Sequence, residues 1–187
     1  ILAARRNQKS IMQTDLEEAI ERVVMGPERK SRLISDEEKR IIAYHEAGHA
    51  VVANAIPEAD PVQKVTIVGR GQAGGVTWFR PDEDRILMSR KKMLATLAMA
   101  LGGRAAEELI FDDITSGASG DIEQVTNMAR AMVTRLGMSA EMGTLVYGKK
   151  EELVFLGREI SEQRDYSDAV AEQIDREVRK LVEDAYK

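Results

Sequence analysis

The sequence contains no cysteine, which excludes disulfide bonds and any metal site built from thiolates. It contains only two histidines, so a transition metal would have to be bound by those two imidazoles together with carboxylate oxygens. Aromatic residues make up 4% of the 187 residues, whereas methionine occurs nine times. This composition favours a helical core filled by aliphatic and flexible side chains.

Long apolar runs and an excess of positive charge are also lacking. No run approaches the roughly 20 apolar residues of a membrane-spanning helix, and no signal peptide is recognisable. The 27 basic and 32 acidic residues give a formal net charge of -5, so we expect no nucleic-acid partner. Because no apolar run is long enough to span a membrane, we expect this piece to be soluble. Both ends of the chain fall within helical patterns, and we therefore expect it to be excised from a longer protein.

Both histidines lie in one five-residue stretch, His45-Glu46-Ala47-Gly48-His49, which is the HExxH pattern of zinc-dependent hydrolases. In a helix, positions i and i+4 share a face, so the two imidazoles can reach a single zinc ion. Glu46 is then placed to take a proton from a water at the metal. Gly48 costs about 1 kcal/mol in a helix interior relative to alanine, which indicates that another segment approaches closely there.

Hydrophobic periodicity predicts a mostly α-helical α+β fold with a small β-hairpin or sheet. The expected helices cover residues 1–25, 35 to about 55, about 86 to 111, 121 to about 136, and a final amphipathic segment that begins at Ser167. Thr14, Ser35 and Ser167 are the expected helix caps. The expected strands cover residues 64–68 and 76–79, with a possible further strand at 145–147.

The glycines between the two expected strands formally match the GxGxxG pattern of dinucleotide-binding sites, at Gly69, Gly71 and Gly74. A strand follows these glycines, whereas a bound phosphate would need the N-terminus of a helix. We therefore expect no cofactor-binding site of this kind.

A hydrolytic zinc site uses three protein ligands and leaves the fourth position to water. No third histidine exists, so the third ligand must be a carboxylate, and the candidates are Glu107, Glu108, Asp112, Asp113 and Asp121. Helical periodicity places Glu108 on the same inward stripe as Leu97 and Leu101, and Asp121 on the inward stripe with Val125. The residues alone leave the choice between Glu108 and Asp121 open.

Four segments together resemble the peptidase domain of the FtsH family, which are membrane-anchored AAA+ zinc metalloproteases. They are residues 26–32 (GPERKSR), 43–50 (AYHEAGHA), 103–108 (GRAAEE) and 115–121 (TSGASGD), and they occur in the same order as in the family. The resemblance implies a zincin-like active-site helix carrying HExxH, with Asp121 as the third zinc ligand. It moves Glu107 and Glu108 to supporting roles beside the ligands.

The resemblance also implies a domain organisation. Residues 1–26 correspond to the last helices of a preceding AAA+ ATPase module, residues 27–34 to a linker, and residues 35–187 to the zinc peptidase domain, which we expect to be truncated at its C-terminus. The phosphate-binding pattern GxxxxGK[ST] does not occur in the chain. ATP and Mg²⁺ would therefore bind only in the missing upstream module.

The implied activity is ATP-dependent, processive degradation of unfolded membrane and soluble proteins by a homo-hexamer. Its membrane segments would lie upstream of this chain. The protease would act at the cytoplasmic face of the bacterial inner membrane or the organelle equivalent. Gly75, Val76 and Thr77 form a candidate strand edge to which an extended substrate could add by backbone hydrogen bonds, although an ordinary packed strand is equally consistent.

Two other functions would also use a metal at HExxH. The first is a non-catalytic ring-assembly module with a structural metal site, against which the intact Glu46 argues, because a structural zinc site fills its fourth position with a protein ligand. The second is a metal hydrolase acting on a small molecule, which would have a closed apolar pocket.

Overall fold

Helices dominate the computed structural model, which describes residues 1–28, 33–69, 74–81, 86–148 and 165–187. Together with one two-stranded antiparallel sheet, they confirm the expected mostly α-helical α+β fold. The elements are α1 (Leu2–Arg5), α2 (Gln13–Val24), α3 (Asp36–Ala55), β1 (Val62–Thr66), β2 (Val76–Phe79), α4 (Arg90–Phe111), η1 (Ser116–Ala118), α5 (Ser119–Thr134) and α6 (Asp168–Tyr186). None of the helices in the described part of the chain combines the length and apolarity needed to cross a bilayer.

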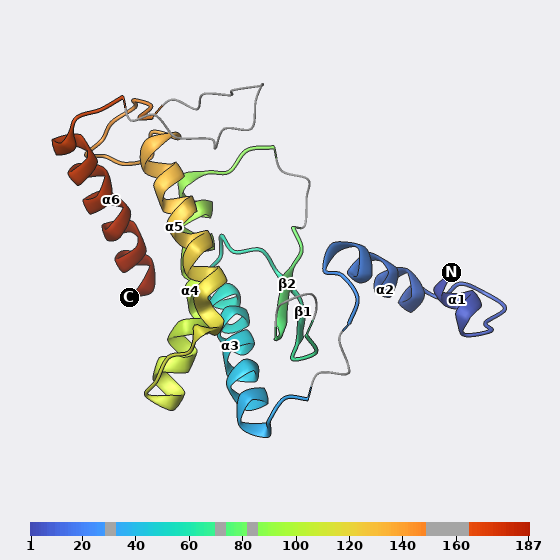
Figure 1. Ribbon diagram of the computed structural model, residues 1–187. Coiled ribbons are helices and arrows are strands. Elements are labelled where there is room, and N and C mark those ends of the chain that lie inside the picture. Colours follow the sequence, from blue (N-terminus) through green and yellow to red (C-terminus); the bar gives the residue numbers. More distant parts are fainter. Residues whose placement is uncertain (29–32, 70–73, 82–85, 149–164) are drawn as a thin grey trace, which may run out of the picture.

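Helix α4 lies at the centre of the arrangement (Figure 1). It packs against α3 on one side and against α5 and α6 on the other, while the sheet packs against α3. The largest buried side chains come from α4, α5 and α6, and they include Leu97, Met132, Val133 and Ile174. Burial of this apolar surface is the main source of stability for the α4–α5–α6 layer.

Serine side chains begin three of the helices. The hydroxyl of Ser35 accepts a hydrogen bond from the Glu38 amide at 3.1 Å, Ser89 caps α4, and Ser167 caps α6. Each such cap contributes about 1 kcal/mol. The expected cap at Thr14 is wrong, because α2 begins at Gln13 and the Asp15 carboxylate binds the Met12 amide.

The sheet is a single antiparallel pair. Lys64, Val65 and Thr66 of β1 lie opposite Trp78, Thr77 and Val76 of β2, with an irregularity between Val62 and Lys64. The predicted strand at 76–79 is confirmed, whereas β1 begins and ends two residues earlier than predicted. Of the glycine pattern, Gly71 lies outside the described residues.

Residues 145–147 form no strand. The amide of Tyr147 instead donates to the Thr134 carbonyl at 2.9 Å, and its hydroxyl donates to the Met142 carbonyl at 3.0 Å. Tyr147 packs against the core, whereas Leu145 and Val146 are exposed, and no strand among the described residues pairs with this stretch.

The N-terminal helices lie on the far side of the sheet from α4 (Figure 1). A bidentate ion pair between the Glu21 carboxylate and Lys64 Nζ, at 2.7 Å to each oxygen, joins α2 to β1. The apolar side chains of Leu16, Ile20 and Val23 on α2 are half exposed or more.

The backbones of α3 and α4 approach each other at two glycines. A Cβ added to Gly48 would lie 2.2 Å from the Gly102 carbonyl oxygen, and one added to Gly102 would lie 2.7 Å from the Gly48 oxygen. The close approach that Gly48 predicted is thus confirmed, and its partner is α4.

We expect Gly48→Ala to lower the free energy of unfolding by about 1 to 3 kcal/mol or more, because the new methyl group meets rigid backbone. Gly120→Ala is the matched control, since a Cβ there meets nothing within 4 Å, and the better helix propensity of alanine should raise stability by up to about 1 kcal/mol. Urea denaturation measures both. A Gly48→Ala chain as stable as the wild type would contradict the close approach.

Candidate metal centre

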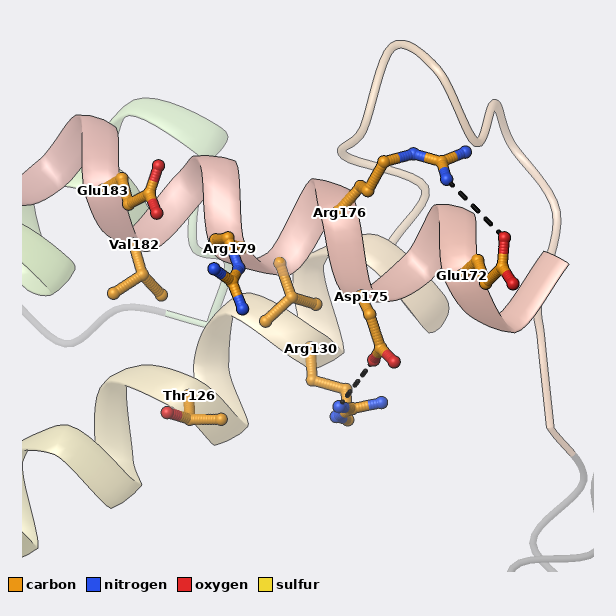
Figure 2. A pocket seen from close by; sticks show the side chains of 9 residues that line it. Thr126, Arg130, Glu172, Asp175, Arg176, Arg179, Val182 and Glu183 are labelled. Atoms are coloured by element: carbon orange, nitrogen blue, oxygen red, sulfur yellow. Dashed lines mark hydrogen bonds and ion pairs between the residues drawn. The ribbon is translucent and has the colours of Figure 1, made fainter. Parts of the chain in front are cut away.

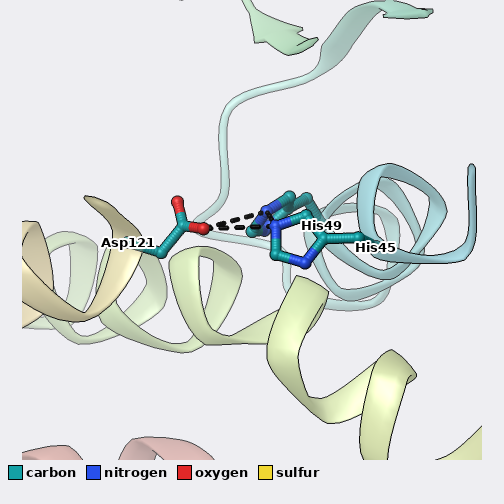
Figure 3. Close-up of side chains that lie close together, drawn as sticks. All are labelled: His45, His49 and Asp121. Atoms are coloured by element: carbon teal, nitrogen blue, oxygen red, sulfur yellow. Dashed lines mark hydrogen bonds and ion pairs between the residues drawn. The ribbon is translucent and has the colours of Figure 1, made fainter. Parts of the chain in front are cut away.

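Three side chains converge between α3 and the first turn of α5 (Figure 3). The Nε2 atoms of His45 and His49 lie 3.1 Å apart. The Asp121 Oδ2 atom lies 3.2 Å from His45 Nε2 and 3.7 Å from His49 Nε2. Both histidines are buried and Asp121 is partly buried, and within the described residues this is the one cluster of His and acidic groups compact enough to hold a metal ion.

The second nitrogen of each imidazole has its own partner. His45 Nδ1 lies 2.6 Å from Glu107 Oε1, and His49 Nδ1 lies 2.9 Å from the Met99 carbonyl oxygen. Because both partners are acceptors, each Nδ1 donates its proton to its partner, and in the neutral imidazole Nε2 then has the lone pair that a metal ion needs. The amide of Gly103 lies 3.3 Å from His49 Nδ1, farther than the Met99 carbonyl oxygen. The carbonyl therefore determines the tautomer of His49.

This arrangement fits a zinc ion. Two Nε2 lone pairs and a carboxylate oxygen face one another, and such acceptors repel unless a cation lies between them. Ligand atoms about 2.0 to 2.2 Å from a tetrahedral zinc ion are separated by about 3.3 to 3.6 Å. The three observed separations are 3.1, 3.2 and 3.7 Å, so the donor set needs little adjustment.

The surroundings of His45 favour positive charge. Burial lowers the pKa of His45, but hydrogen bonds and charge interactions with Asp121 and Glu107 raise it more, and the pKa lies above the usual value for histidine. The same two carboxylates would stabilise a bound cation at this position.

Glycine leaves the space that the imidazoles occupy. A Cβ added to Gly103 of α4 would lie 2.5 Å from His45 Nε2 and 2.6 Å from His49 Nε2. Any side chain at this position would displace both rings, so the contact between α3 and α4 also shapes the site.

Glu107 connects the histidines to the segment that carries Asp121. Its Oε2 atom accepts a hydrogen bond from the Thr115 amide at 2.7 Å, and the Thr115 hydroxyl accepts one from the Gly117 amide at 3.1 Å. The side chain is almost fully buried, with 1% of its surface exposed. Both carboxylate oxygens of Glu107 are thus used to orient parts of the cluster.

Glu46 lies beside the cluster in sequence and faces the sheet. It is buried, with 7% of its surface exposed. The Thr77 hydroxyl lies 2.7 Å from Glu46 Oε2 and 2.9 Å from the Glu46 carbonyl oxygen. The buried carboxylate therefore has a hydrogen-bond donor from β2.

The sequence pattern of peptidase family M41 matches residues 32–187. The chain belongs to peptidase family M41. This membership confirms the family that the four sequence segments indicated.

This M41 chain is similar to part of three longer curated relatives. It is 58% identical over 187 residues to the ATP-dependent zinc metalloprotease FtsH 1 of Sphaerobacter thermophilus, and 57% identical over 186 residues to the ATP-dependent zinc metalloprotease FtsH of Rubrobacter xylanophilus. It is 54% identical over 187 residues to the corresponding protein of Thermotoga maritima. The matches cover 100% of this chain but only 29% to 31% of the relatives.

The structure of the M41 chain places Glu107, and not Glu108, against His45. Glu108 is exposed and accepts a hydrogen bond from the Tyr186 hydroxyl of α6. The inward position predicted for Glu108 is wrong. Helix α4 is covered on two sides, and its last turns face α3 through Gly103 and Glu107. The exposed Asp112 ends α4 and the exposed Asp113 binds the Ile114 amide, so neither belongs to the cluster.

Sequence reasoning missed two contributors to the M41 site. The Met99 carbonyl leaves no trace in a sequence, because every residue has one. Gly103 had a visible signal in the Gly102-Gly103 pair that interrupts an apolar helix, which is typical of close helix approach.

A separate cleft of about 740 Å³ lies between α5 and α6 (Figure 2). Arginines and acidic residues line it in equal number, with ion pairs between Arg130 and Asp175 and between Arg176 and Glu172. Because charges of both signs offset each other, this cleft favours neither anions nor cations.

Replacing Glu107 with glutamine should weaken zinc binding by about 10- to 100-fold, because the amide NH₂ must face either the Nδ1–H of His45 or the Thr115 amide. Glu108→Gln is the matched control and should bind zinc like the wild type. Competition with a chelator measures both affinities. Equal affinities of Glu107→Gln and the wild type would contradict an orienting role for Glu107.

Proposed function

We propose that this chain is the zinc endopeptidase part of an ATP-dependent protease that degrades unfolded membrane and soluble proteins processively. One observation carries the proposal: the buried imidazoles of His45 and His49 converge with the Asp121 carboxylate, and the buried Glu46 follows His45 in sequence, in a chain of peptidase family M41. A site of three protein ligands leaves one position open, as hydrolytic zinc sites require.

His45, His49 and Asp121 would hold the zinc ion. When bound, zinc supplies a Lewis acid that polarises the scissile carbonyl and makes the attacking water more acidic. Glu107 and the Met99 carbonyl hold the two imidazoles in the tautomer that presents Nε2 to the ion. Glu108 is exposed and accepts a hydrogen bond from Tyr186, so it would take no part in zinc binding.

Glu46 would act as the general base and then as the general acid. Its carboxylate takes a proton from the attacking water and delivers it to the amine that leaves when the peptide bond breaks. Burial of Glu46 supports this role, because a base excluded from bulk solvent exchanges its proton with the reacting groups and not with surrounding water.

The strand edge at Gly75, Val76 and Thr77 would hold the substrate. Within the described residues β2 pairs with β1 alone, which leaves its other edge available for an extended peptide. Backbone hydrogen bonds do not depend on side chains, so this mode of binding suits an enzyme that accepts many unfolded sequences.

We assign residues 1–26 to the end of an AAA+ ATPase module, residues 27–34 to a linker and residues 35–187 to the peptidase domain. The family match beginning at residue 32 and the relatives' names support this division. ATP and Mg²⁺ would bind upstream of this chain. The assembled protein would be a homo-hexamer anchored by upstream membrane segments, at the cytoplasmic face of the bacterial inner membrane or the organelle equivalent.

Asp121→Asn should weaken zinc binding more than the roughly 100-fold upper range for residues that only orient a ligand, because it removes a ligand charge. Asp113→Asn is the matched control and should retain wild-type affinity. Chelator competition measures the affinities, and a zinc-bound structure identifies the third ligand directly. Tight binding by Asp121→Asn would overturn the assignment.

Glu46→Gln should keep zinc and assembly while lowering peptide cleavage by about 10²- to 10⁴-fold, because the amide cannot accept a proton. The measurement is ATP-dependent cleavage of an unfolded protein by the full-length, ATPase-linked form, together with its zinc content. Cleavage at the wild-type rate would exclude Glu46 as the base.

A further inference from the structure

The start of β2 contacts the carboxylate of Glu46 at two positions. Thr77 is the second residue of β2, and Gly75 immediately precedes the strand. The Thr77 hydroxyl lies 2.7 Å from Glu46 Oε2. A Cβ added to Gly75 would lie 2.7 Å from both Glu46 Cγ and Oε1.

We propose that Thr77 is a positioning residue for Glu46: its hydroxyl holds Oε2 by a hydrogen bond, while Gly75 leaves the space in which Oε1 lies. This inference rests on the proposed function, in which Glu46 is the general base. It assigns to β2 a role in catalysis that is separate from binding the substrate backbone.

The position of the Thr77 hydroxyl is set by the sheet. Thr77 lies opposite Val65 in the antiparallel pair, and Val76 lies opposite Thr66. The backbone pairing on both sides of this position restricts movement of the threonine relative to α3. A threonine also has restricted χ1 rotation, so little side-chain freedom is lost when the bond to Glu46 forms.

The Thr77 hydroxyl contacts two acceptors of Glu46. It lies 2.7 Å from the carboxylate oxygen Oε2 and 2.9 Å from the backbone carbonyl oxygen. A hydroxyl carries one proton, and a carboxylate is the stronger of these two acceptors. The threonine is therefore placed to hold the side chain of Glu46 against β2.

The same strand would hold both the base and the substrate. The Thr77 side chain and the open space at Gly75 face Glu46, whereas one backbone edge of β2 has no partner strand within the described residues. A rigid shared support keeps the distance between base and scissile bond constant, and errors of about 1 Å in such a distance cost up to about 100-fold in rate.

The activity test compares Thr77→Val, Thr77→Ser and the matched control Thr66→Val in the full-length, ATPase-linked form. The Thr66 hydroxyl accepts from the Val68 amide and does not contact Glu46 in the structure. Thr77→Val should lower kcat by about 10- to 100-fold, with KM and zinc content unchanged. Thr77→Ser should restore most of kcat, and Thr66→Val should resemble the wild type.

The outcomes separate this proposal from the proposed function. Absent cleavage by the wild type, or wild-type cleavage by Glu46→Gln, overturns both. With those controls as expected, wild-type kcat in Thr77→Val, or no recovery in Thr77→Ser, overturns the positioning role alone. Gly75→Ala is a second variant, because it keeps the hydroxyl but displaces the carboxylate. It should lower kcat with zinc retained, and a wild-type kcat would also overturn the proposal.

A double-mutant cycle tests the contact without any activity measurement. The thermal midpoint of the 187-residue chain is measured for Thr77→Val with Glu46 present and in a Glu46→Ala background. The decrease should be larger when Glu46 is present, because only then is a hydrogen bond to its carboxylate lost. Equal decreases in the two backgrounds would overturn the proposed bond.

Discussion

The close approach of α3 and α4 at Gly48 and Gly102 is the constraint on which the site depends. It brings the next residue, Gly103, beneath the two imidazoles, where any side chain would collide with both Nε2 atoms. It also brings the Met99 carbonyl to His49 and the Glu107 carboxylate to His45. One helix contact therefore positions both histidines and sets the tautomer of each ring.

Hydrogen bonds of the Glu107 carboxylate connect the contact between α3 and α4 to the segment that carries Asp121, the third side chain of the cluster. Glu107 uses one oxygen for His45 and the other for the Thr115 amide, and residue 115 begins the turn that leads through η1 into α5. Asp121, in the first turn of α5, meets the histidines there. A buried carboxylate with both oxygens occupied is stable in this interior because its charge is compensated by donors.

The two halves of the site have different supports. Helices α4 and α5 determine the arrangement of His45, His49 and Asp121. Thr77 of β2, together with Gly75 just before this strand, determines the surroundings of Glu46. The sheet reaches Glu46 because β1 and β2 both pack on α3. Substitutions in different elements can therefore alter metal binding and proton transfer separately. The effect of each on peptide cleavage can then be measured independently.

Much of this protein follows from local sequence. The HExxH motif in a serine-capped helix predicts that the two histidines share a face. Periodicity predicts the strand at 76–79 and the final helix. These features depend only on residues that are close in sequence. Only the tertiary structure decided which face of α4 meets α3, and hence that Glu107 and not Glu108 contacts His45. It also revealed the Met99 carbonyl and the Thr77 hydroxyl, because contacts between residues 31 to 62 positions apart depend on how elements pack and not on their individual patterns.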